Sequence, residues 1–96
     1  MQTITVPELK ARLQAGEKIN LLDVREPDEY AEQNLNGVLI PLGKVLNGQI
    51  EEIEDWRDKE VIIHCRSGKR SFQACMILEQ MGFSNVKNLE GGILAW

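Results

Sequence analysis

Short apolar runs alternate with amphipathic segments along this chain of 96 residues. The most apolar run, Val61 to His64, is rich in β-branched residues, which is typical of a strand buried on both faces of a sheet. Four other runs predict further strands. They lie at Thr3–Thr5, Ile19–Val24, Val38–Ile40 and Val86–Leu89.

The segment after the first strand carries the signals of a helix. Thr5 and Glu8 are spaced as a capping box, in which each side chain bonds to the backbone N–H of the other residue. Gly16 is a plausible end of this helix, because glycine adopts the left-handed conformation that commonly follows a last turn. The apolar face of the helix consists of Val6, Leu9 and Leu13.

The clearest helix spans residues 69–81 and is followed by Gly82 as its predicted C′ residue. Pro27 predicts a short helix after the second strand, since proline suits a first helical position. In the segment 42–58, Ile50 and Ile53 fall at helical spacing, and residues 91–96 look like the beginning of a last helix. The apolar stripe of the helix over 69–81 is formed by Ala74, Ile77, Leu78 and Met81.

This alternation of strands and helices predicts an α/β fold in a single domain over residues 1–96, with a mostly parallel sheet and helices on both faces. In such sheets, ligands bind beyond the carboxyl ends of the strands. Cys65 lies at such an end, directly after the run Val61 to His64.

Composition limits the expected cellular location and the expected classes of binding partner. No apolar run is long enough for a membrane span, and the first residues lack a signal-peptide pattern. Two cysteines in such a chain favour reduced thiols and a cytoplasmic location. A net charge of −4 argues against nucleic acid as a partner, and nothing indicates a membrane partner.

Cys65 has the surroundings of a reactive cysteine. A short, cation-rich loop leads from it into the helix of residues 69–81, and the N–H groups of such a loop and of a first helical turn are free to bind an anion. The helix dipole and the cations Arg66, Lys69 and Arg70 should lower the pKa of the Cys65 thiol. We therefore predict that Cys65 is a catalytic nucleophile that acts on a small anionic substrate.

Five motif-bearing segments are Leu22–Glu26, Glu29–Tyr30 with Gly37 and Pro41 downstream, Cys65–Ser71, Gly82–Val86 and Gly91–Trp96. In this order, and over nearly the whole chain, they resemble the single-domain rhodaneses, a family of thiosulfate or persulfide sulfurtransferases. The resemblance implies a rhodanese-like sheet of five strands with Cys65 as the sulfur carrier. The chain departs from the family in Asn34 to Val38, where rhodaneses usually read His-Ile-Pro-Gly-Ala; this affects loop packing or a partner surface more than catalysis.

In the mechanism that the resemblance implies, Cys65 takes sulfane sulfur from thiosulfate or a persulfide and passes it to cyanide or to the thiol of a small molecule or protein. Sulfur is both nucleophile and leaving group, so no cofactor and no metal is expected. Arg66 and Lys69 are candidates to bind the anionic donor, while the loop N–H groups would cradle the persulfide. The predicted substrate-binding residues are Arg66, Ser67, Gly68, Lys69, Arg70 and Ser71.

Other polar residues are predicted to support this loop. Arg70 should mainly stiffen it by bonding to backbone carbonyls or to an acid such as Glu26 or Asp23, with direct contact to the anion as the lesser alternative. Asp23 and Arg25 end a neighbouring strand, and a structural ion pair or backbone bonding is favoured over a catalytic role, because buried charges need partners.

His64 and Cys75 are predicted to be structural. Adjacent strand residues point to opposite faces, so His64 cannot easily form a dyad with Cys65. Cys75 lies beside Ala74 on the apolar side of its helix, where a small residue packs against a sheet; a resolving thiol is the lesser alternative.

Two other functions remain open at this level. Cysteine phosphatases and arsenate reductases use the same strand, loop and helix, but tyrosine-type phosphatases place five residues between the cysteine and the arginine. This chain has four, between Cys65 and Arg70, which makes a tighter cradle suited to one sulfur atom. A non-catalytic binding module is the other alternative, although the cysteine and its cations are present.

Overall fold

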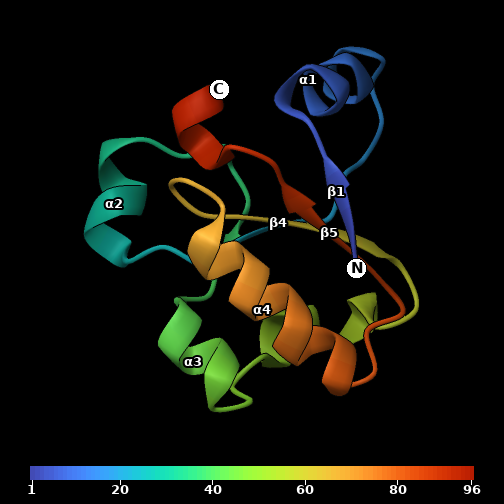
Figure 1. The fold of residues 1–96 in the computed structure, drawn as a ribbon, viewed down its shortest axis with the longest axis vertical. Helices are drawn as coiled ribbons and strands as arrows, with labels where there is room; N and C mark the ends of the chain where they lie inside the picture. The colour runs from blue at the N-terminus through green and yellow to red at the C-terminus, as the bar shows by residue number, and fades with distance from the viewer.

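The computed structural model describes residues 1–96 and has a sheet of five strands at its centre (Figure 1). All neighbouring strands are parallel, in the order β1-β5-β4-β2-β3. The predicted α/β class and five-stranded sheet are thus confirmed. The strands are β1 (Gln2–Ile4), β2 (Leu21–Asp23), β3 (Val38–Leu39), β4 (Glu60–His64) and β5 (Asn85–Leu89).

Helices connect these strands, and none of them is long and apolar enough to cross a membrane. Four are α-helical: α1 (Val6–Gln14), α2 (Pro27–Glu32), α3 (Leu42–Leu46) and α4 (Lys69–Gln80). Two short 3₁₀ helices are η1 (Glu51–Trp56) and η2 (Gly92–Ala95).

The two faces of the sheet have separate hydrophobic cores, as expected for a sheet with helices on both sides. Residues of β4 alternate between them: Ile62 packs in a cluster with α1, whereas Val61 and Ile63 belong to a larger cluster with α3, η1 and α4. Cys65 belongs to the larger cluster. The loop of residues 65–68 between β4 and α4, called the reactive loop below, therefore lies on the face of the sheet that α4 covers, where α3 and α4 lie side by side (Figure 1).

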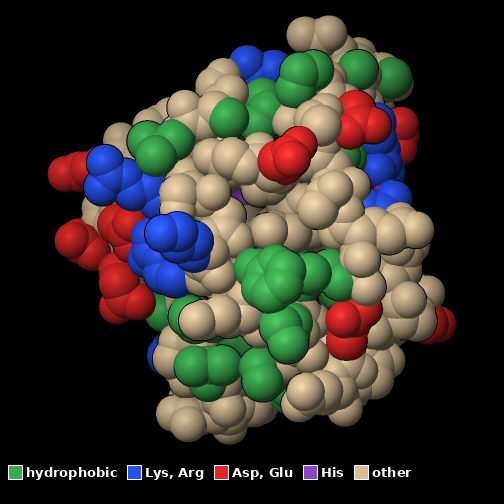
Figure 2. All heavy atoms as spheres, viewed as in Figure 1, with side chains coloured by type: hydrophobic (Ala, Val, Ile, Leu, Met, Phe, Trp, Pro, Cys, Tyr) green, Lys and Arg blue, Asp and Glu red, His purple; other side chains and the backbone are tan.

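The outer surface of this same layer is partly apolar. Leu46, Phe72 and Met76 are exposed at 50%, 45% and 46%, and Figure 2 shows apolar side chains gathered over α4 and α3. Phe72 and Met76 lie on α4 outside its buried face, which consists of Ser71, Ala74, Cys75 and Leu78, and Leu46 is the last residue of α3.

Local signals predicted the long helices well. The capping box of α1 is formed, because the Thr5 hydroxyl accepts from the Glu8 N–H at 3.2 Å and the Glu8 carboxylate accepts from the Thr5 N–H at 2.9 Å. The helix expected over residues 69–81 is α4, with Met81 as its C-cap and Gly82 in the left-handed region at φ +99°.

Other boundaries differ from those expected. The first strand is one residue earlier because Thr5 is the cap of α1, and the second begins at Leu21 rather than at Ile19. In the segment 42–58, α3 was not predicted, since it has fewer than two full turns. The spacing of Ile50, Ile53 and Trp56 is three residues, which is the period of the 3₁₀ helix η1.

Candidate active site

The loop between β4 and α4 folds around the sulfur of Cys65. This residue is only 1% exposed, and its Sγ accepts hydrogen bonds from the Gly68 N–H at 3.1 Å and from the Ser71 hydroxyl at 3.4 Å. Gly68 has φ +106°, a left-handed conformation that turns its N–H toward the sulfur. A tight loop and the first turn of α4 therefore surround one sulfur atom with donors.

These donors set the ionisation of Cys65. Burial is the largest single influence and opposes the charged form, but hydrogen bonds from the Ser71 hydroxyl and from the N–H groups of Ser71, Gly68 and Ser67 together outweigh it and lower the pKa of Cys65. From the sequence, a lowered pKa of the Cys65 thiol was predicted, with the helix dipole and the neighbouring cations as its cause. The predicted direction agrees with the structure, and the N–H groups at the beginning of α4 are among its causes, whereas Arg66 and Lys69 are exposed and contribute less than the hydrogen bonds.

Arg70 stiffens the loop, but through a different acid from those expected. Its guanidinium forms two hydrogen bonds to the Glu29 carboxylate, at 2.7 and 2.8 Å, rather than to Glu26 or Asp23. Figure 2 shows cations and acids side by side where the N-terminal end of α4 meets α2. The Arg70 guanidinium lowers the pKa of Glu29 to about 2. The Glu26 carboxylate is exposed and makes no ion pair. Glu26 instead begins α2 in a capping box with Glu29, whose carboxylate accepts from the Glu26 N–H at 2.8 Å.

Asp23 and Arg25 form the predicted structural ion pair. Both are buried, and Arg25 Nη2 lies 2.8 Å from Asp23 Oδ2. The same guanidinium donates to the carbonyl oxygens of Glu29, at 3.3 Å, and Gln33, at 2.6 Å. The pair thus bonds to the middle and the C-terminal end of α2, the helix that supplies the partner of Arg70.

His64 faces Asp23 and not the reactive sulfur. It is fully buried, its Nε2 lies 3.6 Å from Asp23 Oδ2, and neither ring nitrogen has a hydrogen-bond partner. Burial lowers the pKa of His64; the charge of Arg25 acts in the same direction and that of Asp23 opposes it. The absence of a Cys–His dyad agrees with the prediction.

This neutral buried histidine should make stability depend on pH. The unfolded chain takes up a proton near pH 6.5 that the folded chain resists, so the free energy of unfolding should fall as the pH drops below about 6.5. At pH 5.5 the loss should reach up to about 1.4 kcal/mol relative to pH 7.5. Urea denaturation at both pH values tests this, with His64→Gln as the variant that lacks the effect. An equal pH dependence in the two proteins contradicts the assignment.

Cys75 lies on the buried side of α4 and is fully buried. Burial raises the pKa of this thiol to about 12, so it stays neutral at ordinary pH. This is the environment of an inert cysteine, in line with the structural role expected for it.

Two features of the site had no clear signal in the sequence. The Ile93 N–H donates to the Cys65 carbonyl oxygen at 3.0 Å, and the Leu94 N–H donates to that of Arg66 at 3.1 Å. These two hydrogen bonds join η2 to the backbone of the reactive loop. Gly91 and Gly92 were noted as a motif, which is the signal that could have located this contact. The second feature is Asn88 of β5, which bonds to both Gly68 and Ser71.

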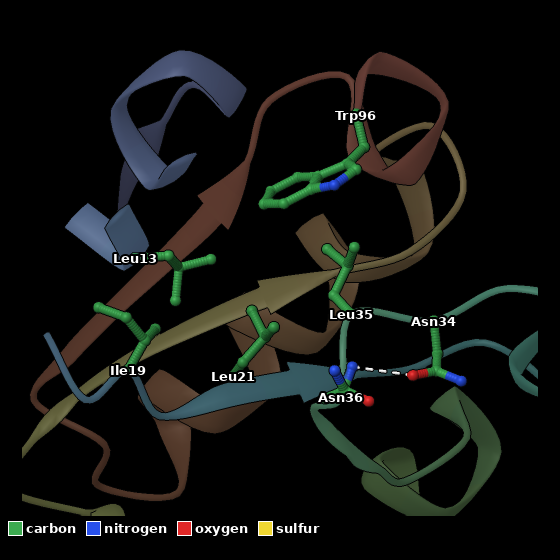
Figure 3. Close-up of a pocket in the computed structure, with 7 residues that line it drawn as sticks. All are labelled: Leu13, Ile19, Leu21, Asn34, Leu35, Asn36 and Trp96. Atoms are coloured by element: carbon green, nitrogen blue, oxygen red, sulfur yellow. Dashed lines mark hydrogen bonds between the residues drawn. The ribbon is translucent and has the colours of Figure 1, made fainter. Parts of the chain in front are cut away.

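Two cavities lie at different places in the molecule, and one of them is beside the reactive loop. One of about 240 Å³ lies beside the loop, between Arg66 and α2, and is lined by Arg25, Glu29, Glu32, Gln33, Arg66, Ile93 and Leu94. The other, of about 460 Å³, lies on the α1 face and is open and mostly apolar (Figure 3). Trp96 forms one wall of this second cavity, opposite Leu13 and Ile19. Only the first cavity borders the reactive loop.

Residues 5–96 match the model of the rhodanese-like domain family. A sulfurtransferase of Allochromatium vinosum is 41% identical over 88 residues, which cover 92% of this chain and 80% of that protein. The Bacillus subtilis protein YtwF is 38% identical over 100% of this chain and 90% of its own length. The crystal structure of a rhodanese-like domain protein from Staphylococcus aureus superposes with a TM-score of 0.87 at 31% identity, covering 100% of this chain and 91% of that one.

Proposed function

The chain belongs to the rhodanese-like domain family of sulfurtransferases, and we propose that it moves sulfane sulfur from thiosulfate or a persulfide donor to a thiol or cyanide through a persulfide on Cys65. The observation that carries this proposal is the Gly68 N–H, which points at the Cys65 sulfur from 3.1 Å. A donor in that position stabilises negative charge on sulfur and leaves little room for a larger anion.

The reaction has two displacement steps. In the first, the Cys65 thiolate attacks the outer sulfur of the donor, and the donor's sulfur–sulfur bond breaks with its electron pair on the leaving group, which is sulfite when the donor is thiosulfate. In the second, the acceptor attacks the outer sulfur of the persulfide, and Cys65 leaves as a thiolate. Electrons balance in each step, so no external oxidant or reductant is needed.

Arg66 and Lys69 have the exposure that capture of an anionic donor requires. Neither forms an ion pair within the chain, in contrast to Arg70, and Arg66 also lines the cavity beside the loop. We assign these two cations to donor binding and Arg70 to positioning of the loop.

The position of Arg70 also bears on the phosphatase alternative. A phosphatase needs its loop arginine free to hold the oxygens of the transferred group, whereas Arg70 is engaged by both carboxylate oxygens of Glu29. This observation and the short spacing from Cys65 both favour sulfur transfer. Hydrogen-bond donors around a buried sulfur stabilise its charged form, and a non-catalytic binding module does not use that form.

Intact mass of the reduced protein after incubation with thiosulfate tests the proposal. We expect a gain of one sulfur, about 32 Da, that dithiothreitol removes. Cys75→Ala is the matched control and should gain the same mass, whereas Cys65→Ser should gain none. Absence of the adduct with thiosulfate, with an organic persulfide and with mercaptopyruvate contradicts the proposal.

Arg66→Ala should raise the KM for thiosulfate about five- to tenfold with little change in kcat, because the loss of an exposed cation weakens binding of the dianion. The matched control is Lys59→Ala, which removes an exposed, unpaired cation from the turn before β4. Initial rates at several ionic strengths make the comparison. An unchanged KM for Arg66→Ala contradicts the role given to Arg66.

A further inference from the structure

Asn88 connects the two groups that donate to the reactive sulfur. It lies on β5 beside Ile63 of β4 and is 7% exposed. Its Nδ2 donates to the Gly68 carbonyl oxygen at 3.1 Å, and its Oδ1 lies 2.5 Å from the Ser71 hydroxyl. Gly68 and Ser71 in turn bond to the Cys65 sulfur at 3.1 and 3.4 Å. A buried amide thus lies behind both donors.

The direction of these bonds follows from the chemistry of the groups. A backbone carbonyl only accepts, so the side of the Asn88 amide that faces Gly68 must be the NH₂ group. Its oxygen then faces Ser71 and can only accept. Because a serine hydroxyl carries one proton, Ser71 can make a strong hydrogen bond to Asn88 or to the Cys65 sulfur, so the two acceptors compete for it.

We propose that Asn88 is a positioning residue that controls Cys65 through Ser71: its amide oxygen holds the Ser71 proton while the sulfur is neutral and gives it up when the sulfur carries charge. The inference rests on the proposed role of Cys65 as the ionising nucleophile. It adds a residue of β5 to the site and gives the Ser71 hydroxyl two alternating partners.

The two positions match the two states of the sulfur in the reaction. In the thiolate, the Ser71 hydroxyl points to Sγ. In the persulfide, Sγ is bonded to the transferred sulfur and is neutral, so the hydroxyl returns to Asn88. When the acceptor removes the outer sulfur, charge returns to Sγ and the hydroxyl turns back. Only an O–H group rotates, and no proton or electron leaves the site.

This arrangement predicts the direction in which removal of the Asn88 amide shifts the ionisation of Cys65. Since Asn88 competes with the thiolate for the Ser71 proton, removal of the amide should favour the thiolate. If Asn88 only held the loop in place, its removal would let the Gly68 N–H move away from the sulfur and would disfavour the thiolate. The loop retains other ties without Asn88, because the Phe72 N–H also donates to the Gly68 carbonyl at 3.1 Å and the Ile93 N–H to that of Cys65 at 3.0 Å.

The test is a titration of thiolate formation in the Cys75→Ala background, followed by ultraviolet absorbance and by the rate of alkylation with iodoacetamide. Asn88→Ala should lower the midpoint pH of thiolate formation at Cys65 by about 0.5 to 1 pH unit, and Ser71→Ala should raise this midpoint. Introduced together with Ser71→Ala, Asn88→Ala should have no further effect. The charged or titratable groups that lie around the sulfur and stay unchanged throughout are Arg66, Lys69 and Arg70 of the loop and α4, Glu29 of α2 and His64 of β4.

A higher or unchanged midpoint in folded Asn88→Ala overturns the proposal, and so does an equally lowered midpoint when Ser71 is absent. Asn88→Leu has a similar volume without a polar atom and should lower the midpoint in the same way, so a folding defect in one variant leaves the other as a test. The titration needs no sulfur transfer. Failure of the proposed function is seen separately, as the absence of a sulfur adduct on the wild-type protein.

Discussion

Cys65→Ser should lose sulfur transfer by a factor of about 10⁴ or more while remaining folded, because the variant lacks the nucleophile itself. The hydrogen bonds that lower the pKa of the Cys65 thiol cannot ionise a serine hydroxyl to a useful extent at neutral pH, and oxygen forms no stable counterpart of the persulfide. The side chain is nearly the same size, so the larger hydrophobic cluster should keep its packing. Initial rates of thiocyanate formation from thiosulfate and cyanide measure the loss.

The matched control for this experiment is Cys75→Ala. It removes the other thiol of the chain, which is buried and has its pKa raised to about 12, and should leave the rate within a factor of about two. Its stability should fall by about 1 kcal/mol, since a buried side chain becomes smaller. Full activity in Cys65→Ser contradicts the assignment of the carrier. A folded but inactive Cys75→Ala protein would show instead that Cys75 acts as a resolving thiol.

Gly92→Ala should destabilise the fold by about 2–4 kcal/mol and remove most of the activity. Gly92 has φ +60°, and a Cβ at this position would overlap the Arg66 carbonyl oxygen and lie 2.7 Å from that of Cys65. Both are backbone atoms of the reactive loop, so they cannot move aside as a flexible side chain would. Relief of the overlap must separate η2 from the loop and lengthen the hydrogen bonds from Ile93 and Leu94.

Gly16→Ala is the control that separates conformation from contact. Gly16 also has a positive φ, +83°, but an added Cβ there meets no atom within 4 Å. We expect the free energy of unfolding of this variant to fall by only about 1 kcal/mol, which is the cost of the left-handed conformation for alanine, and its activity to be kept. Urea denaturation and the thiocyanate assay on both variants make the comparison. Equal losses of stability, or an active Gly92→Ala protein, contradict the proposed contact.

Local patterns in the sequence determined the main elements and the reactive centre. An uninterrupted apolar, β-branched run is typical of a strand buried on both faces, which identified β4, and the capping box of Thr5 and Glu8 located the beginning of α1. Cys65 followed from its place between a strand and a helix. The Asp23–Arg25 pair was also predictable, because its members are two residues apart at the end of one strand. All of these depend on neighbours within a few residues.

Tertiary structure alone decided which distant groups complete the site. Arg70 reaches Glu29 across 41 positions, and Asn88 reaches Ser71 across 17. These contacts depend on the register of β5 against β4 and on how α2 and α4 pack, which the close packing of the two cores determines. The spacing of residues along the chain does not determine which of these distant side chains come into contact. The sequence therefore identified the nucleophile and the N–H donors of its loop, whereas the residues that hold this loop in place came from the packed structure.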